Sequence, residues 1–162
     1  MHTSSAELHY SGKLRVRVCG VCQQANQLLL IRHKPFAQNK SGLWSMPGGG
    51  LHYGETLELG LEREFKEETG LQVKVGSFLF VHEFISLPLH ALELFFAVTI
   101  TGGELTTGFD PELEPHNQLI AEVAFKSLPD IQELPPDQLH QVLQGLHSLD
   151  DLYRKGFSSC IP

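Results

Sequence analysis

The chain has 162 residues, 41% of them hydrophobic and 19% charged, which are the proportions of one ordinary globular domain. Its formal net charge of −7 argues against a polymeric nucleic acid or an anionic membrane as partner, because both attract basic surfaces. No segment approaches the ~20 consecutive apolar residues of a membrane span. Met1 to Gly12 lacks the apolar stretch of a signal peptide, so we expect a cytoplasmic protein.

The composition changes little along the chain, and there are no repeats. We therefore expect a single domain over residues 13–150, with an N-terminal extension over 1–12 and a C-terminal tail over 151–162. Cys19 and Cys22 form a Cys-x-x-Cys pair within a predicted strand, where residues three apart point to opposite faces. A redox pair favours a helix N-terminus and a structural zinc site needs a second pair, so we interpret both as half-buried thiols.

The first elements in chain order are strands. Alternating and apolar patterns predict strands over 15–22 and 27–32, joined as a hairpin by a turn at 23–26. Residues 33–43 are then expected to form a loop, which ends in a short extended piece over Leu43–Met46.

A helix is predicted over Thr56–Thr69. Thr56 is a suitable N-cap, and Gly70 suits the C-terminal cap. Gly60 is a poor helix former, and a small residue there would let the helix lie close to a sheet. The apolar residues that recur every four positions form the expected core face: Leu57, Leu61 and Phe65.

The second half of the chain predicts strands over 71–85, 89–101 and 122–126, with a long acidic loop over 102–120. The segment 137–149 has helical periodicity, with one apolar face formed by Leu139, Val142, Leu143 and Leu146. Strands interleaved with helices, and strand pairs that suggest hairpins, predict an α/β fold with a mixed sheet between helices.

Three carboxylates crowd one turn of the predicted helix: Glu64, Glu67 and Glu68. Like charges three or four residues apart repel on a helix surface. A hard divalent cation, Mg²⁺ or Mn²⁺, would compensate them, and such ions usually accompany a phosphate substrate. Arg63 is placed to pair with Glu67, which would leave Glu64 and Glu68 to bind the metal. A charge cluster alone is more often a solvated face, so the residues that precede the helix matter.

A glycine-rich loop is predicted before the helix, at Pro47-Gly48-Gly49-Gly50. Glycine permits backbone conformations closed to other residues and lets the backbone approach a ligand closely. A glycine run alone is more often a flexible turn. Glu55, near the start of the helix, is placed to brace this segment by accepting hydrogen bonds. Together with the acidic turn, these residues predict a site for a metal and a phosphate.

The spacing of these residues matches the Nudix box at every defined position: Gly49, five residues, Glu55, seven residues, then residues 63–71. The chain therefore resembles Nudix hydrolases, and the resemblance implies an α/β/α sandwich that hydrolyses a nucleoside diphosphate linked to another group. By position in the box, Arg63 and Glu55 match orienting residues of the family. Gly48 or Gly49 would offer a backbone carbonyl to the metal. The glutamates that match metal ligands are Glu64, Glu67 and Glu68.

The box identifies the substrate only as a small nucleoside diphosphate derivative. A nucleotide sugar such as ADP-ribose and a nucleoside triphosphate both remain open. Pro88 lies near a proline that ADP-ribose-cleaving members often carry, but a single proline at such a position is more often just part of a turn. Non-catalytic nucleotide sensing is the alternative function, although sensing modules often lose box glutamates that this chain keeps. Arg32 and the three glycines are the candidate substrate-binding residues: Gly48, Gly49 and Gly50. Whether the protein forms a homodimer is left open.

The general base is unassigned. Many family members carry a further glutamate before the last strand, but here the matching positions look like Asn117 and Gln118, which cannot serve as a base. The candidates that remain are Glu112, Glu114 and Glu122. The nine histidines are scattered without ligand-like spacing, so we expect structural or solvated roles for them.

Overall fold

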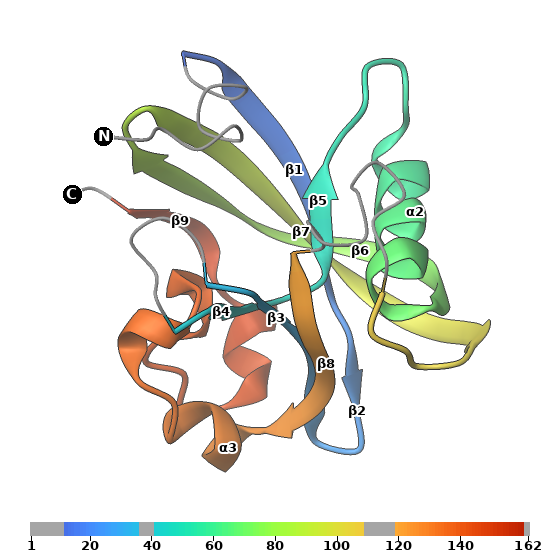
Figure 1. Ribbon diagram of the computed structural model, residues 1–162, viewed down its shortest axis with the longest axis vertical. Helices are drawn as coiled ribbons and strands as arrows, with labels where there is room; N and C mark the ends of the chain where they lie inside the picture. The colour runs from blue at the N-terminus through green and yellow to red at the C-terminus, as the bar shows by residue number, and fades with distance from the viewer. Residues whose placement is uncertain (1–11, 36–40, 109–118, 161–162) are drawn as a thin grey trace.

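The computed structural model describes residues 12–35, 41–108 and 119–160, which form two sheets with helical segments on both sides (Figure 1). No helix in these ranges is long and apolar enough to cross a membrane.

The larger sheet has five strands in the order β5-β1-β7-β6-β9. It is mixed, because β7 runs parallel to β1 and β9 runs parallel to β6, while the other two pairs are antiparallel. Its strands are β1 (Leu14–Val21), β5 (Gly48–Gly50), β6 (Leu71–Ser86), β7 (Leu89–Gly103) and β9 (Gly156–Cys160).

The smaller sheet has four strands and is antiparallel throughout, with β3 paired to β2, β4 and β8. Its strands are β2 (Gln23–Gln24), β3 (Gln27–His33), β4 (Leu43–Ser45) and β8 (Ile120–Ser127). The short extended piece and the strand before the C-terminal segment are therefore present. The predicted hairpin is wrong in its pairing: β3 pairs with Gln23–Gln24, which were expected to lie in the turn, whereas β1 pairs with β5 and β7 in the larger sheet.

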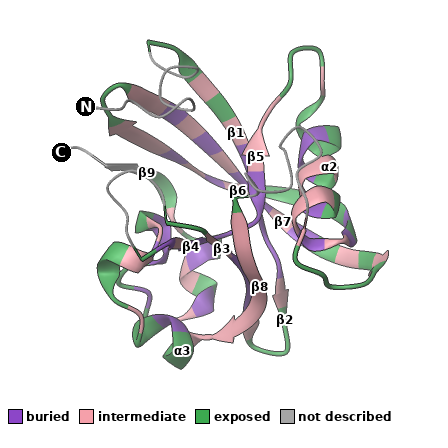
Figure 2. Ribbon diagram, viewed as in Figure 1, coloured by how far each residue is buried: buried purple, intermediate pink, exposed green. Residues whose placement is uncertain are grey.

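Two apolar clusters lie on opposite sides of the strands. One joins strand residues to helix α2 (Leu57–Thr69) through Leu61 and Phe65. The other joins strand residues to helix α3 (Leu128–Gln132) and to the segment that follows it. Cys19 belongs to one cluster and Cys22 to the other, as opposite faces require, although both thiols are fully buried rather than half-buried. This arrangement confirms the predicted α/β fold with a mixed sheet between helices (Figure 2).

Helix α2 begins and ends as its sequence predicts. The side chain of Thr56 accepts a hydrogen bond from the Leu59 amide, and Gly70 adopts a left-handed conformation at φ 73°. The expectation that Leu57 is in the core is wrong, since it is 37% exposed. The first turn lies against the preceding loop instead of the sheet: a Cβ on Gly60 would meet Leu51 and Glu55 within 2.9 Å.

The helix predicted over 137–149 is absent, and 3-10 turns take its place at Pro136–Gln138, Gln141–Leu143 and Leu149–Tyr153. Its apolar face is buried as expected, at Leu139, Val142, Leu143 and Leu146. The backbone departs from a helix because Leu139 is extended and bridges to Trp44, whose carbonyl accepts the His140 amide at 2.8 Å. Pairing with β4 here overrides the helical preference of the sequence.

Candidate active site

The glycine run forms strand β5 rather than the predicted loop, and it pairs antiparallel with β1. Close packing explains two of its glycines. A Cβ on Gly48 would lie 2.1 Å from the Val18 carbonyl oxygen, and Gly48 has φ 147°. A Cβ on Gly49 would lie 2.4 Å from Oε1 of Glu64. The glycines therefore let β5 approach both β1 and the acidic turn of α2.

Arg63 organises the carboxylates next to β5. Its Nε and Nη2 donate to the two oxygens of Glu55 at 2.8 and 3.1 Å, and Nη2 also donates to the Gly50 carbonyl at 3.1 Å. Its Nη1 donates to Glu64 at 2.9 Å and to Glu67 at 3.3 Å. The expected pair with Glu67 is present, but Glu64 is also paired, because one guanidinium carries five N–H donors.

Glu55 braces the segment as expected. Its Oε2 accepts a hydrogen bond from the His52 amide at 3.1 Å, in addition to the bidentate contact from Arg63. The hydrogen bond from Arg63 holds the pKa of Glu55 down, at about 2, with burial acting in the opposite direction. Glu55 is therefore an ionised anchor that joins the start of α2 to its acidic turn.

The negative charge of Glu68 is compensated less completely than that of Glu55. Its Oε2 accepts the amide N–H of Gly48 at 2.7 Å. Burial, and then repulsion from Glu64, raise its pKa well above the usual range, and the Gly48 amide and Arg17 offset this only in part. Burial also raises the pKa of Glu64, against the effect of Arg63. Burial and mutual repulsion therefore disfavour the charged forms of Glu64 and Glu68 when no cation is bound. Both residues offer only oxygen atoms as ligands, which suits a hard divalent cation.

The chain that follows β7 returns to this turn. The amides of Thr106 and Gly108 donate to the carbonyls of Thr69 and Glu68 at 2.9 and 2.8 Å. A Cβ on Gly108 would lie 2.0 Å from the Glu67 carbonyl oxygen, so the two segments are in tight contact. Part of the predicted 102–120 loop thus packs on the acidic turn.

The other candidates lie elsewhere or outside the described residues. Glu112 and Glu114 are among the residues that the structure does not describe. Glu122 lies on β8, where its carboxylate pairs with Nε of Arg32 at 3.3 Å. The Arg32 guanidinium also lies 5.9 Å from the Trp44 ring centre. Arg32 is therefore engaged within the smaller sheet, and its expected contact with substrate stays a prediction.

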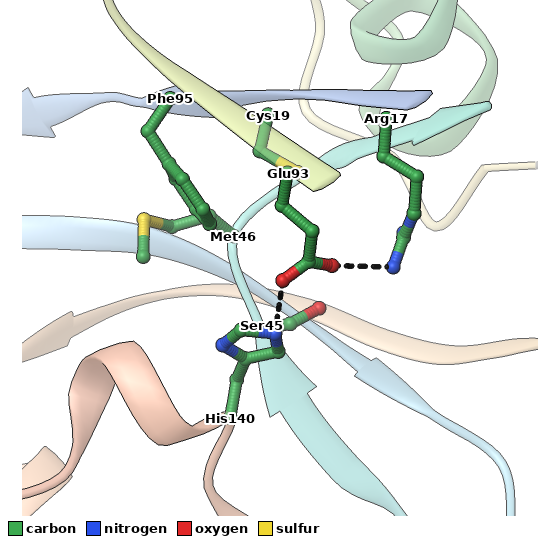
Figure 3. A pocket seen from close by; sticks show the side chains of 7 residues that line it. All are labelled: Arg17, Cys19, Ser45, Met46, Glu93, Phe95 and His140. Carbon is green, nitrogen blue, oxygen red and sulfur yellow. Dashed lines mark hydrogen bonds and ion pairs between the residues drawn. The ribbon is translucent and has the colours of Figure 1, made fainter. Parts of the chain in front are cut away.

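A second group of charged residues was missed by the sequence analysis (Figure 3). Arg17 donates from Nη1 to Oε1 of Glu93 at 2.9 Å and from Nη2 to the Gly48 carbonyl at 3.1 Å. The other oxygen of Glu93 lies 2.8 Å from Nε2 of His140. These residues line a small recess with room for about one water molecule, too small for a nucleoside. The only signal in the sequence was a carboxylate inside the apolar run 89–101.

His82, Glu93 and His140 place ligating atoms within 4.8 Å of one another, an arrangement that could suggest a metal centre. The hydrogen bonding of His140 argues against one. Its Nδ1 accepts the Val142 amide at 3.3 Å, so the neutral ring carries its hydrogen on Nε2. Nε2 therefore presents an N–H, not a lone pair, toward Glu93, although the contact is poorly aligned. We interpret the group as a buried polar network.

Comparison with known proteins agrees with the box. The family model of the NUDIX domain matches residues 13–153, so the chain belongs to the Nudix family. It is 39% identical over 99 residues to an ADP-ribose pyrophosphatase from Methanocaldococcus jannaschii. The aligned region covers 59% of this chain and 56% of that protein. It is 34% identical over 96 residues to an 8-oxo-dGTP diphosphatase from Proteus vulgaris. Here the aligned region covers 58% of this chain and 83% of that protein.

Solved structures agree on the fold. A NUDIX hydrolase from Nitrosomonas europaea superposes with a TM-score of 0.71 at 19% identity, over 88% of this chain and 90% of that one. At this identity the likeness concerns the fold alone. The chain is thus a Nudix-fold protein similar to pyrophosphatases and diphosphatases of that family.

Proposed function

We propose that this protein is a Mg²⁺- or Mn²⁺-dependent pyrophosphohydrolase that cleaves the diphosphate linkage of a small nucleoside diphosphate derivative. The observation that carries the proposal is the pair Glu64 and Glu68, set against the glycine strand β5, with incomplete compensation of their charge. Glu67 completes the proposed ligand set at the same turn, and Arg63 reaches it.

A divalent cation bound there would neutralise the diphosphate and lower the pKa of a bound water. The residues of the chain then have separate tasks. Glu64, Glu67 and Glu68 supply oxygen ligands. Arg63 orients two of them and ties them to Glu55, so that the carboxylates keep their positions when substrate is absent. Gly49 and Gly50 remain the proposed backbone contacts to the phosphates on the edge strand β5, where the Gly50 carbonyl already accepts Arg63.

For the substrate we favour a capped diphosphate, such as a nucleotide sugar, over a nucleoside triphosphate. The segment that packs on the acidic turn carries Glu104. Its negative charge disfavours a bare polyphosphate tail more than a capped one. The names of the two relatives, one an ADP-ribose pyrophosphatase and one an 8-oxo-dGTP diphosphatase, cover both classes.

A panel of nucleotide sugars and nucleoside triphosphates, assayed with Mg²⁺ and with excess EDTA, tests the proposal. We expect metal-dependent release of a nucleoside monophosphate and a sugar phosphate from a nucleotide sugar, with a higher kcat/KM than for release of pyrophosphate from a triphosphate. Nucleotide binding without turnover would instead support the sensing module, and full activity in EDTA would contradict the proposal.

Three further expectations belong to the proposal. Glu112, Glu114 and Glu122 stay open as the general base, and single Gln variants of each would identify it through the loss of kcat. A cytoplasmic location and a homodimer stay predictions, which cell fractionation and light scattering would test.

A further inference from the structure

We propose that Glu93 is a positioning residue for the candidate metal site: it holds Arg17 against the carbonyl of Gly48 and so keeps the Gly48 amide on Glu68. The inference depends on the proposed function, because it gives Glu93 a task in that site. It rests on contacts that run from a strand in the middle of the larger sheet to the edge strand that faces α2.

The contacts form a continuous path, and Figure 3 shows its first contact, between Glu93 and Arg17. Glu93 on β7 is 3% exposed and accepts Nη1 of Arg17, from the adjacent strand β1, at 2.9 Å. The same guanidinium donates Nη2 to the Gly48 carbonyl at 3.1 Å. Gly48 in turn donates its amide to Oε2 of Glu68 at 2.7 Å. Three hydrogen bonds thus separate Glu93 from a proposed metal ligand.

Gly48 is the link that needs support. Glycine is the residue with the least conformational restraint of its own. Its φ of 147° and its closeness to Val18 also exclude a larger side chain that could stiffen it. Arg17 on the carbonyl and Glu68 on the amide therefore restrain this residue from both sides. A loose guanidinium would free one side, and the amide that orients Glu68 would lose its fixed direction.

Arg17 cannot keep its place alone. Burial opposes its positive charge, whereas the nearby carboxylate of Glu93 favours it. Nε of Arg17 has no hydrogen-bond partner in the described residues, so Nη1 and Nη2 carry the orientation. On the far side, Nε2 of His140 lies 2.8 Å from Glu93 and restrains the carboxylate. Because Glu93 has its charged partner on one oxygen and His140 on the other, its rotation is limited.

Glu93 also has a purely structural interpretation, in which it only neutralises the half-buried Arg17. Both interpretations predict lower stability without it, so stability does not separate them. They differ in two respects. The positioning role predicts weaker metal binding by the folded protein, and it predicts that the effect of Glu93 disappears when Arg17 is already gone.

The test measures Mn²⁺ binding to the metal-free full chain by EPR of free Mn²⁺, together with kcat and KM. Variants are Glu93→Gln, Arg17→Met and the double variant. The control is Glu83→Gln, which removes a carboxylate paired with His90 at 3.0 Å in the same β6–β7 hairpin. Far-UV circular dichroism and thermal unfolding confirm that each variant is folded at the assay temperature.

We expect Glu93→Gln to weaken Mn²⁺ binding by about 10- to 100-fold, the usual cost of losing an outer-shell partner. Its kcat should fall similarly, while KM for the nucleotide changes little. The double variant should bind Mn²⁺ no worse than Arg17→Met, because residues acting through one contact are not additive. Glu83→Gln should match the wild type. Unchanged Mn²⁺ binding by Glu93→Gln, multiplied losses in the double variant, or an equal loss in Glu83→Gln would each overturn the inference.

If Glu93→Gln does not fold, variants of His140, which restrains Glu93, test the inference instead. His140→Leu should weaken Mn²⁺ binding, and His140→Gln, which restores an N–H donor, should recover most of it. Equal binding by these two variants would overturn the inference. A wild-type protein that neither binds Mn²⁺ nor hydrolyses any nucleotide would refute the proposed function itself, which is a different outcome from failure at Glu93.

Discussion

The acidic turn of α2 and the group formed by Arg17, Glu93 and His140 are both crowded with charge, but they differ in how the charge is balanced. In the acidic turn, Glu64 and Glu68 repel each other and burial disfavours the charge of both. In the other group, a carboxylate has an arginine on one oxygen and a histidine against the other. Compensated charges stabilise a fold, whereas uncompensated ones mark a place for a ligand.

The largest expected effect separates the two regions directly. Loss of an outer-shell partner costs up to ~100-fold in activity. Glu68→Gln should reduce kcat by more than this, because it removes a proposed metal ligand. The metal-free variant should be at least as stable as the wild type, since a repulsion is relieved. Glu93→Gln should instead lower stability, because it leaves the half-buried Arg17 without its charged partner. Steady-state kinetics and thermal unfolding in EDTA measure both, and near-wild-type turnover by Glu68→Gln at saturating Mg²⁺ would contradict the ligand assignment.

Metal removal should affect the acidic turn alone. A ligand that binds only the folded state raises its stability by about 2.7 kcal/mol at 100 times Kd. We therefore expect Mg²⁺ to raise the Tm of the wild type above its value in EDTA. Glu68→Gln should lose most of this increase, and Glu83→Gln should keep it. An equal increase in all three proteins would place the bound cation elsewhere.

The contrast also explains what the sequence could predict. The acidic turn is local: its carboxylates, Arg63 and Glu55 lie within one short stretch, so helical spacing and the box were enough to bring them together. Arg17, Glu93 and His140 come from three distant parts of the chain. Only the parallel pairing of β1 and β7, in which Arg17 faces Glu93, places the first two side by side.

Two of three errors in the predicted fold have the same origin. The apolar residues predicted for 137–149 are buried, yet their periodicity did not reveal that Leu139 pairs with Trp44 and ends any helix there. The glycines were expected to form a loop, but pairing with β1 makes them a strand. Leu57 was assigned to the core from spacing alone, whereas Gly60 shows that the first turn packs on the loop. The first two misses are contacts between segments far apart in the sequence, whereas the third is a contact with the loop just before the helix, which helical spacing alone does not reveal.

A third prediction concerns the contact between β5 and the acidic turn. Gly49→Ala should lower kcat by about tenfold, because a Cβ there would displace the carboxylate of Glu64. Gly50→Ala is the matched comparison, since a Cβ at that position would meet only Arg15, at 3.6 Å, and should cost less. The kcat of the two variants at saturating Mg²⁺ gives the result. An equal loss in both would mean that β5 tolerates no side chain at all, whatever the position of Glu64.

The smallest effect is a pH dependence with opposite signs at the two ends of the site. The pKa of Glu55 is lowered to about 2 by Arg63, so its contribution to stability is present above the ordinary carboxyl pKa of 4.5. That contribution should be lost as pH falls from about 4.5 toward 2. The wild type should therefore be more stable than Glu55→Gln at neutral pH, and the difference should close in acid. The effect is small because Arg63 keeps Glu64, Glu67 and the Gly50 carbonyl as acceptors.

Glu68 should behave in the reverse way. Because its pKa is raised, the protonated carboxyl is favoured in the metal-free folded state, and stability is lost as pH rises above the ordinary value. The Tm of Glu68→Gln minus that of the wild type, measured in EDTA, should thus grow with pH. The Tm of Glu55→Gln minus that of the wild type should become more negative as pH rises from about 2 to 4.5. Subtracting the wild type at each pH removes the carboxylates common to all three proteins. If both differences moved in the same direction, the distinction between an anchored carboxylate and one that awaits a cation would fail.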